Sequence, residues 1–394
     1  VIMGTSFGSI ISLGIGPIVM ASIILQLLVG SKILDIDTST DEGKRFFQGL
    51  QKLLVFFFII FEALIYVVMK GLEAMPGYTF IVVLQLVLGG LVILFMDEVC
   101  HKWGFGSGVS LFIAAGVGWR LITSAFGFLG SQGNFQASGK VIAFVVSLIN
   151  ADSQGAMLAL AAVLSTVILF LLIVWAQSLK IEIPLSYDRL RGYSMKWPLQ
   201  FFYASVIPVI LTAALIANLQ LFGGLLQNWM GHATFLGNMV NGRAVSGFLY
   251  WIDSTDIVSA LITGSWQWSI LGQTVFHILF YAFFSALFSV FWIKTSGMDA
   301  SNQAQNILKS GLQIPGFRKD ERILESVLKR YVLPLTVMGG IAIGLLAAVA
   351  DVLGTLTGGT SLLLGIMIIF QLYQNIAQQH AMDMNPAMKK MMGI

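Results

Sequence analysis

The sequence predicts an all-α integral membrane protein, a multi-span helical bundle, on three observations. Hydrophobic residues make up 57% of the 394 residues, charged residues only 10%, and the mean hydropathy is +0.86. A soluble domain carries about a quarter charged residues, so this chain has too few to cover a surface that faces water. The apolar residues also fall into runs of about 20, the length a helix needs to cross a bilayer. This composition excludes a soluble enzyme, a secreted disulfide scaffold and a disordered protein.

Nine apolar runs between polar clusters are the expected spans. In chain order they cover residues 10–30, 49–70, 78–96, 108–128, 156–176, 199–221, 267–293, 332–352 and 360–378. Most of the 22 Lys and Arg residues lie in the connectors that follow the odd-numbered spans. Positive charge accumulates on the cytoplasmic side of membrane proteins, so these connectors and the C-terminus are expected there.

The first span is expected to be broken near residues 15–17. Gly14, Gly16 and Pro17 lie inside it, and proline removes a backbone donor while glycine weakens a helix. The alternative is a proline kink packed against neighbouring helices. The motif recurs, because GPIV at 16–19 resembles IPVI at 207–210 in the sixth span. Likewise, the start of the fourth span at 106–113 resembles that of the ninth at 358–364.

The members of each pair run through the membrane in opposite directions, as an inverted-topology repeat requires. We therefore expect two inverted halves, residues 1–150 with four spans and 151–394 with five, and a chain that lacks one N-terminal span. Such folds place their working site where the repeats meet. The repeated positions there are aliphatic, namely Ile15, Val19, Val109 and Ile113, with Ile210 and Leu364 as their counterparts. Core packing is the default for such residues, but a ring of them in place of polar ligands indicates a dewetted constriction.

The residues that enzyme chemistry requires are missing. Cys100 is the only cysteine, which excludes an intrachain disulfide and a Cys-rich zinc site. The four histidines are scattered, no HExxH motif occurs, and no Walker A sequence indicates nucleotide hydrolysis. GTSFG at 4–8 matches the nucleophile-elbow pattern only formally, since that motif needs a strand-turn-helix setting. We expect no metal, no cofactor and no enzymatic activity.

Two long connectors, 177–198 and 294–331, are basic. They are either ordinary solvated loops or a docking platform for an acidic partner such as ribosomal RNA. Suitable phosphate contacts are Arg189, Arg191, Arg318 and Lys319. Glu62 is the one acidic residue clearly at membrane depth, and an intramembrane carboxylate needs a partner or water.

Several motifs, in order over essentially the whole chain, carry a family resemblance. They are LGIGPIVMASIILQLLVG, FQGLQKLL, MDEVCHKWGFGSGVSLFIAAGV, IEIPL, KWPLQFFYASVIPVIL, PGFRKDE and LKRYVLPLTVMGG. The chain resembles the SecY family, the large subunit of the Sec protein-conducting channel, most of all its archaeal members. The resemblance implies a ten-span fold of two inverted halves in the plasma membrane, with the first span absent here. It also implies a channel that passes unfolded polypeptides and releases apolar segments sideways into lipid.

The resemblance assigns roles to individual residues. A short plug helix that closes the external funnel would include Thr5, Ser6, Ile10, Ile11 and Leu13, and the pore ring would be the six aliphatic residues above. The lateral gate between the first and sixth spans would include Met20, Glu62 and Val206. Val206 stands where the family commonly has Asn, and Met20 where it has a small polar residue. We hypothesise that this makes the gate seam more apolar, so that signals must be more hydrophobic to open it.

The implied partners are SecE-like and Sec-beta small subunits, the ribosome through the basic loops, signal peptides, nascent chains and membrane lipid. The alternative function is secondary transport of a small solute by a fold with a discontinuous helix and inverted repeats. That function needs polar ligands around residues 14–17 and a coupling-ion site, neither of which is visible in the sequence.

Overall fold

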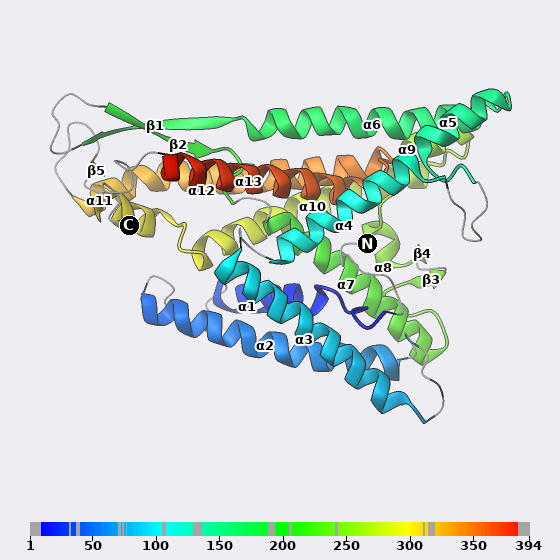
Figure 1. The fold of residues 1–394 in the computed structure, drawn as a ribbon, viewed down its shortest axis with the longest axis horizontal. Coiled ribbons are helices and arrows are strands. Elements are labelled where there is room, and N and C mark those ends of the chain that lie inside the picture. The colour runs from blue at the N-terminus through cyan, green and yellow to red at the C-terminus, as the bar shows by residue number, and fades with distance from the viewer. Residues whose placement is uncertain are drawn as a thin grey trace.

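Long helices dominate the protein and run in roughly one direction through it (Figure 1). The computed structural model describes residues 9–30, 33–36, 40–69, 72, 75, 77–104, 108–128, 136–187, 194–204, 207–240, 243–309, 312–313 and 320–384. Within these ranges, seven helices have the length and apolar composition to cross a membrane. The prediction of an all-α membrane bundle is therefore confirmed.

The first four expected spans correspond to four helices. They are α1 (Gly16–Gly30), α2 (Asp41–Val68), α3 (Thr79–Trp103) and α4 (Gly108–Phe126). At 15 residues α1 is shorter than a full span. By contrast, α2 starts eight residues before the apolar run, because Thr40 caps its polar first turn by accepting a hydrogen bond from Gly43 N. A short helix, α5 (Lys140–Ile149), follows α4.

The other five expected spans correspond to α6 (Ser153–Gln177), α7 (Ile207–Met230), α10 (Trp268–Thr295), α12 (Glu321–Val352) and α13 (Gly359–Met384). Two boundaries differ from expectation. The sixth span was expected from residue 199, but α7 begins only at Ile207, with Pro208 in its first turn, where a missing N–H costs nothing. Conversely, α12 begins at Glu321 with Asp320 as its cap, 11 residues before the apolar run expected from residue 332. The short helices α8 (Phe248–Ile252), α9 (Ile257–Thr263) and α11 (Ala300–Lys309) lie in the connectors.

Two small sheets, neither expected from the sequence, lie at opposite ends of the molecule (Figure 1). At one end β1 (Lys180–Tyr187) pairs antiparallel with β2 (Ser194–Gln200) and with β5 (Leu312–Gln313). At the other, β3 (Asn238–Val240) pairs with β4 (Arg243–Ser246). The register of Tyr187 with Leu312 joins the two basic connectors into one sheet. Alternation of Ile181, Ile183 and Leu185 was the available signal for β1.

Small residues let helices approach closely, as is typical of membrane bundles. On α12, a Cβ at Gly344 would lie 2.7 Å from the carbonyl oxygen of Tyr281 in α10, and one at Gly340 would overlap the Ser289 hydroxyl. At the middle of the molecule, α1 is buried along most of its length and packs against α2, α7 and α10 (Figure 1). Elements from both predicted halves therefore surround α1.

Candidate pore and gate

The chain enters α1 through a run of turns rather than a helix. Ser12 N donates to Ser9 O at 3.0 Å, Gly14 N to Ile11 O at 2.9 Å and Gly16 N to Leu13 O at 3.2 Å. Gly14 has a φ of 55°, a left-handed conformation that glycine adopts without steric cost. Pro17 then sits in the first turn of α1, where its fixed φ suits the helix. The predicted break in the first span is confirmed.

The aliphatic residues predicted to form a ring come from four separate places in the chain. Ile15 lies immediately before α1 and Val19 in its first turn, Val109 and Ile113 lie in the first turns of α4, Ile210 in α7 and Leu364 in α13. All except Val109 belong to one buried apolar cluster and are at most 7% exposed, while Val109 packs against that cluster from a half-buried position. The fold thus places five of the six in one core cluster with Val109 packed against it, although Ile15 and Leu364 are 349 residues apart in sequence.

Two helices that carry ring residues, α4 and α13, begin in the same way. In α4, Val109 N donates to Asp97 Oδ1 at 2.9 Å. In α13, Thr360 N donates to Asp351 Oδ1 at 2.8 Å. Each aspartate lies near the end of the preceding long helix, and each acceptor satisfies a backbone donor that has no partner inside its own helix. Sequence reasoning missed these caps, although Asp97 and Asp351 lie near the ends of apolar runs.

A glycine at each start permits this contact. A Cβ at Gly108 would come within 2.6 Å of Asp97 Cα, and a Cβ at Gly359 would overlap the backbone of Ala350. Any larger residue would push the helix start away from its cap. The two positions belong to the pair of segments that resembled each other in the sequence.

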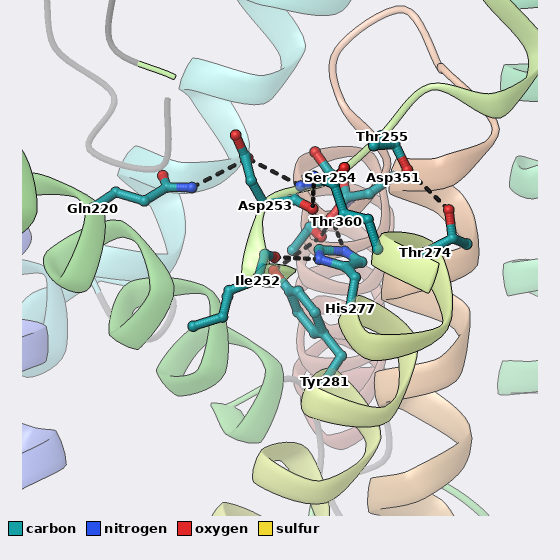
Figure 2. A network of polar contacts seen from close by, with 11 residues as sticks. Gln220, Ile252, Asp253, Ser254, Thr255, Thr274, His277, Tyr281, Asp351 and Thr360 are labelled. Atoms are coloured by element: carbon teal, nitrogen blue, oxygen red, sulfur yellow. Dashed lines mark hydrogen bonds and ion pairs between the residues drawn. The ribbon is translucent and has the colours of Figure 1, made fainter. Parts of the chain in front are cut away.

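The Asp351 cap is part of a buried polar network at the end that carries β3 and β4 (Figure 2). The Thr360 hydroxyl donates to the Asp351 carboxylate and lies 3.3 Å from the Tyr281 hydroxyl. His277 Nδ1 lies 2.5 Å from Ile252 O, and its Nε2 lies 3.8 Å from Asp351 Oδ2. These contacts connect α8, α10, α12 and α13, so the start of α13 is held from three other elements.

Asp253 extends this network toward α7 (Figure 2). Its Oδ1 accepts from Gln220 Nε2 at 3.2 Å and from Ser254 N at 2.9 Å, and Gln273 Nε2 donates to its backbone oxygen at 3.2 Å. Burial raises the pKa of Asp253, with the hydrogen bonds and the charge of Arg243 acting in the opposite direction.

The predicted plug residues fall into two groups. Thr5 and Ser6 lie outside the described residues. Ile10 and Ile11 are exposed, whereas Leu13 is only 2% exposed and packs in a cluster with residues of α2 and α3. The expectation of a plug helix is wrong for residues 9–13, which form turns. The Ser12 hydroxyl donates to Ser9 O at 2.5 Å, a local bond of the kind that competes with helix formation.

The predicted gate residues are also distributed unevenly. Met20 is half-buried on α1 and packs against the main core. Glu62 on α2 is 5% exposed, and its Oε1 has no hydrogen-bond partner within the described part of the chain. Val206 lies outside the described residues. At the far end of α1, a Cβ at Gly30 would lie 2.5 Å from Cδ1 of Phe291 in α10, so α1 is tightly apposed to α10 as well as to α7.

Comparison with known proteins places the chain in a family. The family model described as SecY matches residues 9–373. The chain belongs to the SecY family. The protein translocase subunit SecY of Methanothermobacter thermautotrophicus is 43% identical over 399 residues, which cover 100% of this chain and 86% of the relative.

Two solved structures of SecY-family channels are similar in both sequence and fold. One is the structure of a SecY protein whose plug domain stabilises the closed state of the translocation channel and maintains a membrane seal. Its sequence is 37% identical, its TM-score is 0.82, and the match covers 96% of this chain and 85% of the SecY chain. The other is Sec61 in the canine ribosome–channel complex from the endoplasmic reticulum. Its sequence is 35% identical, its TM-score is 0.79, and the match covers 98% of this chain and 85% of the Sec61 chain.

The basic residues that the SecY resemblance assigns to ribosome docking, Arg189, Arg191, Arg318 and Lys319, lie outside the described residues. The strands that precede them, β1 and β5, pair with each other at one end of the molecule. Among the residues that the structure describes, no group of three or more His, Cys, Asp or Glu side chains is placed to hold a metal ion.

Proposed function

We propose that this chain is the central subunit of a protein translocation channel. It passes unfolded polypeptides across the membrane through the aliphatic ring and releases apolar segments into lipid through a lateral gate. SecY-family relatives are named protein translocase subunits, which are channel components rather than enzymes. The observation that carries the proposal is that six aliphatic residues, from the start of α1 and from α4, α7 and α13, all lie in or against one buried apolar cluster.

An aliphatic ring suits a channel for polypeptides. Flexible apolar side chains can close around an extended chain of any sequence, and they give ions and water no polar group to bind when the channel is at rest. The alternative, a small-solute transporter, needs polar ligands at the break before α1. Leu13, Ile15 and Ile18 are apolar and buried there, and the buried Ser12 hydroxyl donates locally to Ser9 O, which supports the channel.

The proposed division into inverted halves, 1–150 and 151–394, is supported by two matched features. Both α1 and α7 begin with a proline as their second residue, Pro17 and Pro208. Both α4 and α13 begin with a glycine pressed against an aspartate-capped turn. An inverted repeat places such matched features on opposite sides of the membrane.

The same proposal assigns the remaining parts. Residues 5–13 form the plug, and the seam between α1 and α7 is the lateral gate. The end with β1, β2 and β5 faces the cytoplasm together with the C-terminus, and the protein resides in the plasma membrane. Its basic loops dock a ribosome, as the canine Sec61 complex with a ribosome suggests, and it binds SecE-like and Sec-beta subunits. Signal peptides and nascent chains are the transported partners.

Photo-crosslinking to a translocating chain tests the function. A crosslinker is placed at Ile15 or Ile210 in the reconstituted channel complex, and a radiolabelled presecretory protein is stalled in transit. Leu171 of α6 is the matched control, because it is an aliphatic residue that is 62% exposed on the outer surface of the bundle.

We expect crosslinks from Ile15 and Ile210 to the stalled chain and none from Leu171. Equal yields at all three positions, or crosslinks to lipid alone, would contradict a polypeptide path through the ring.

A further inference from the structure

Two adjacent glycines lie in the middle of α3. Gly89 and Gly90 lie on its buried face together with Leu86 and Ile93. Glycine is unfavourable in a helix interior compared with alanine, so a pair of them at this depth indicates that something packs against the backbone.

The two glycines accommodate different neighbours. A Cβ at Gly90 would lie 2.8 Å from Cγ2 of Ile59 in α2, a side-chain atom that a rotamer change can move. A Cβ at Gly89 would overlap the carbonyl oxygen of Ile10 and lie 2.8 Å from its carbonyl carbon. Backbone cannot rotate out of the way, so a larger residue at 89 displaces the segment that contains Ile10.

Leu13 holds the same segment at a second point. It is buried in a cluster with Ala63 and Tyr66 of α2 and with Leu86 of α3. Leu86 and Gly89 are three residues apart and so share one face of the helix. The side chains of Ile10 and Ile11, by contrast, are 61% and 37% exposed. The part of the segment from Ile10 to Leu13 is therefore held against one face of α3 by a close backbone approach at Ile10 and by the buried side chain of Leu13.

We propose that Gly89 is a positioning residue that seats the plug segment in the closed channel. Its lack of a side chain lets the backbone at Ile10 come close enough for Leu13 to reach its cluster. The inference rests on the proposed function, because it takes residues 9–13 as part of the plug.

Two measurements on one substitution test the proposal. Gly89→Ala is prepared in the full channel complex in vesicles, with Gly90→Ala and Gly118→Ala as controls. The Gly90 control meets only a side chain, and the Gly118 control meets nothing within 4 Å. Resting ion flux reports the seal. Distances between spin labels at Ile11 and Leu171, introduced after Cys100→Ser, report the position of the segment without depending on channel function.

We expect Gly89→Ala to raise resting flux several-fold and to shift or broaden the label distances, while both controls behave as wild type. Leu13→Ala should produce the same two changes. The double variant should add little to either single one, because both act on one segment.

Wild-type distances and flux in Gly89→Ala would overturn the proposal. Shifted label distances without a change in resting flux would overturn it too, because they would show that this segment does not seal the channel. The crosslinking test of the polypeptide path would not be affected by that outcome. If Gly89→Ala does not fold, Leu13→Ala decides, and unchanged distances in that variant would overturn the seat.

Discussion

Glu62 and Asp253 are two acidic residues withdrawn from water in different ways. Glu62 lies inside α2 with one carboxylate oxygen unpartnered in the described part of the chain. Asp253 lies in a connector, where one carboxylate oxygen accepts two hydrogen bonds. Burial of a charge is costly unless it is paired, so an acidic residue in either place affects the stability of the fold.

At Asp253 this cost has a pH dependence with a definite sign. Burial raises its pKa, so the folded state disfavours the ionised form relative to the unfolded chain. Its contribution to stability is full below the ordinary carboxyl pKa of about 4 and is lost as pH rises through the raised value.

We therefore predict that Asp253→Asn matches the wild-type melting temperature at acidic pH and exceeds it at neutral pH. Asparagine cannot ionise but keeps the oxygen that accepts from Gln220 and Ser254. Thermal unfolding of the solubilised complex from pH 4 to pH 8 provides the measurement. Parallel pH profiles for the two proteins would show that ionisation at this position does not matter.

At the scale of elements, an aspartate carboxylate caps the start of four long helices, α12 through Asp320 and three others. Asp97 caps α4, Asp351 caps α13, and Asp152 caps α6 through a 3.1 Å bond from Gly155 N. The first two helices carry ring residues within a turn or so of the cap, whereas α6 carries none. The same local interaction therefore serves helix stability in one case and the position of the ring in the other two.

This difference predicts a dissociation between stability and sealing. Asp97→Ala and Asp152→Ala should each lower the free energy of unfolding by about 1 kcal/mol, the usual value of a cap, and Asp351→Ala should lower it further because Asp351 also accepts from the Thr360 hydroxyl. Only Asp97→Ala and Asp351→Ala should raise resting ion flux through the channel complex, because only they loosen a ring-bearing helix. An equal rise with Asp152→Ala would attribute the flux to general destabilisation instead.

The whole molecule has two chemically different ends. One carries the sheet of β1, β2 and β5 between the basic connectors, and the other carries β3, β4 and the polar network around Asp351 (Figure 1). The positive-inside rule predicts that the first end faces the cytoplasm.

The single native cysteine allows this orientation to be tested. Cys100 lies in the last turns of α3, on the predicted cytoplasmic side, and Phe235 is exposed just before β3. In intact cells, a membrane-impermeant maleimide should label Phe235→Cys in a Cys100→Ser background but not native Cys100. In inverted vesicles the pattern should reverse, and a permeant maleimide should label both. Labelling of Cys100 from outside would reverse the assigned topology.

Much of the fold follows from local sequence. Apolar runs located nine of the ten apolar helices in the described part of the chain, all except α5, and Gly14, Gly16 and Pro17 indicated the break before α1. The pairing of Tyr187 with Leu312 could not be found this way, because the two residues are 125 apart and their alternating pattern is short. The close approach of the Ile10 backbone to Gly89 depends likewise on how α3 lies against the segment that precedes α1.

The sequence by itself determined that the chain lives in a membrane, where its helices lie, and which end carries positive charge. Only the tertiary structure decided which apolar residues meet each other. In α6, Leu171 is 62% exposed while Ile173, two positions later, is fully buried. Lipid and protein interior select the same residue types, so hydropathy cannot separate the two environments. Packing alone brings Ile15, Val109, Ile210 and Leu364 into or against one buried apolar cluster.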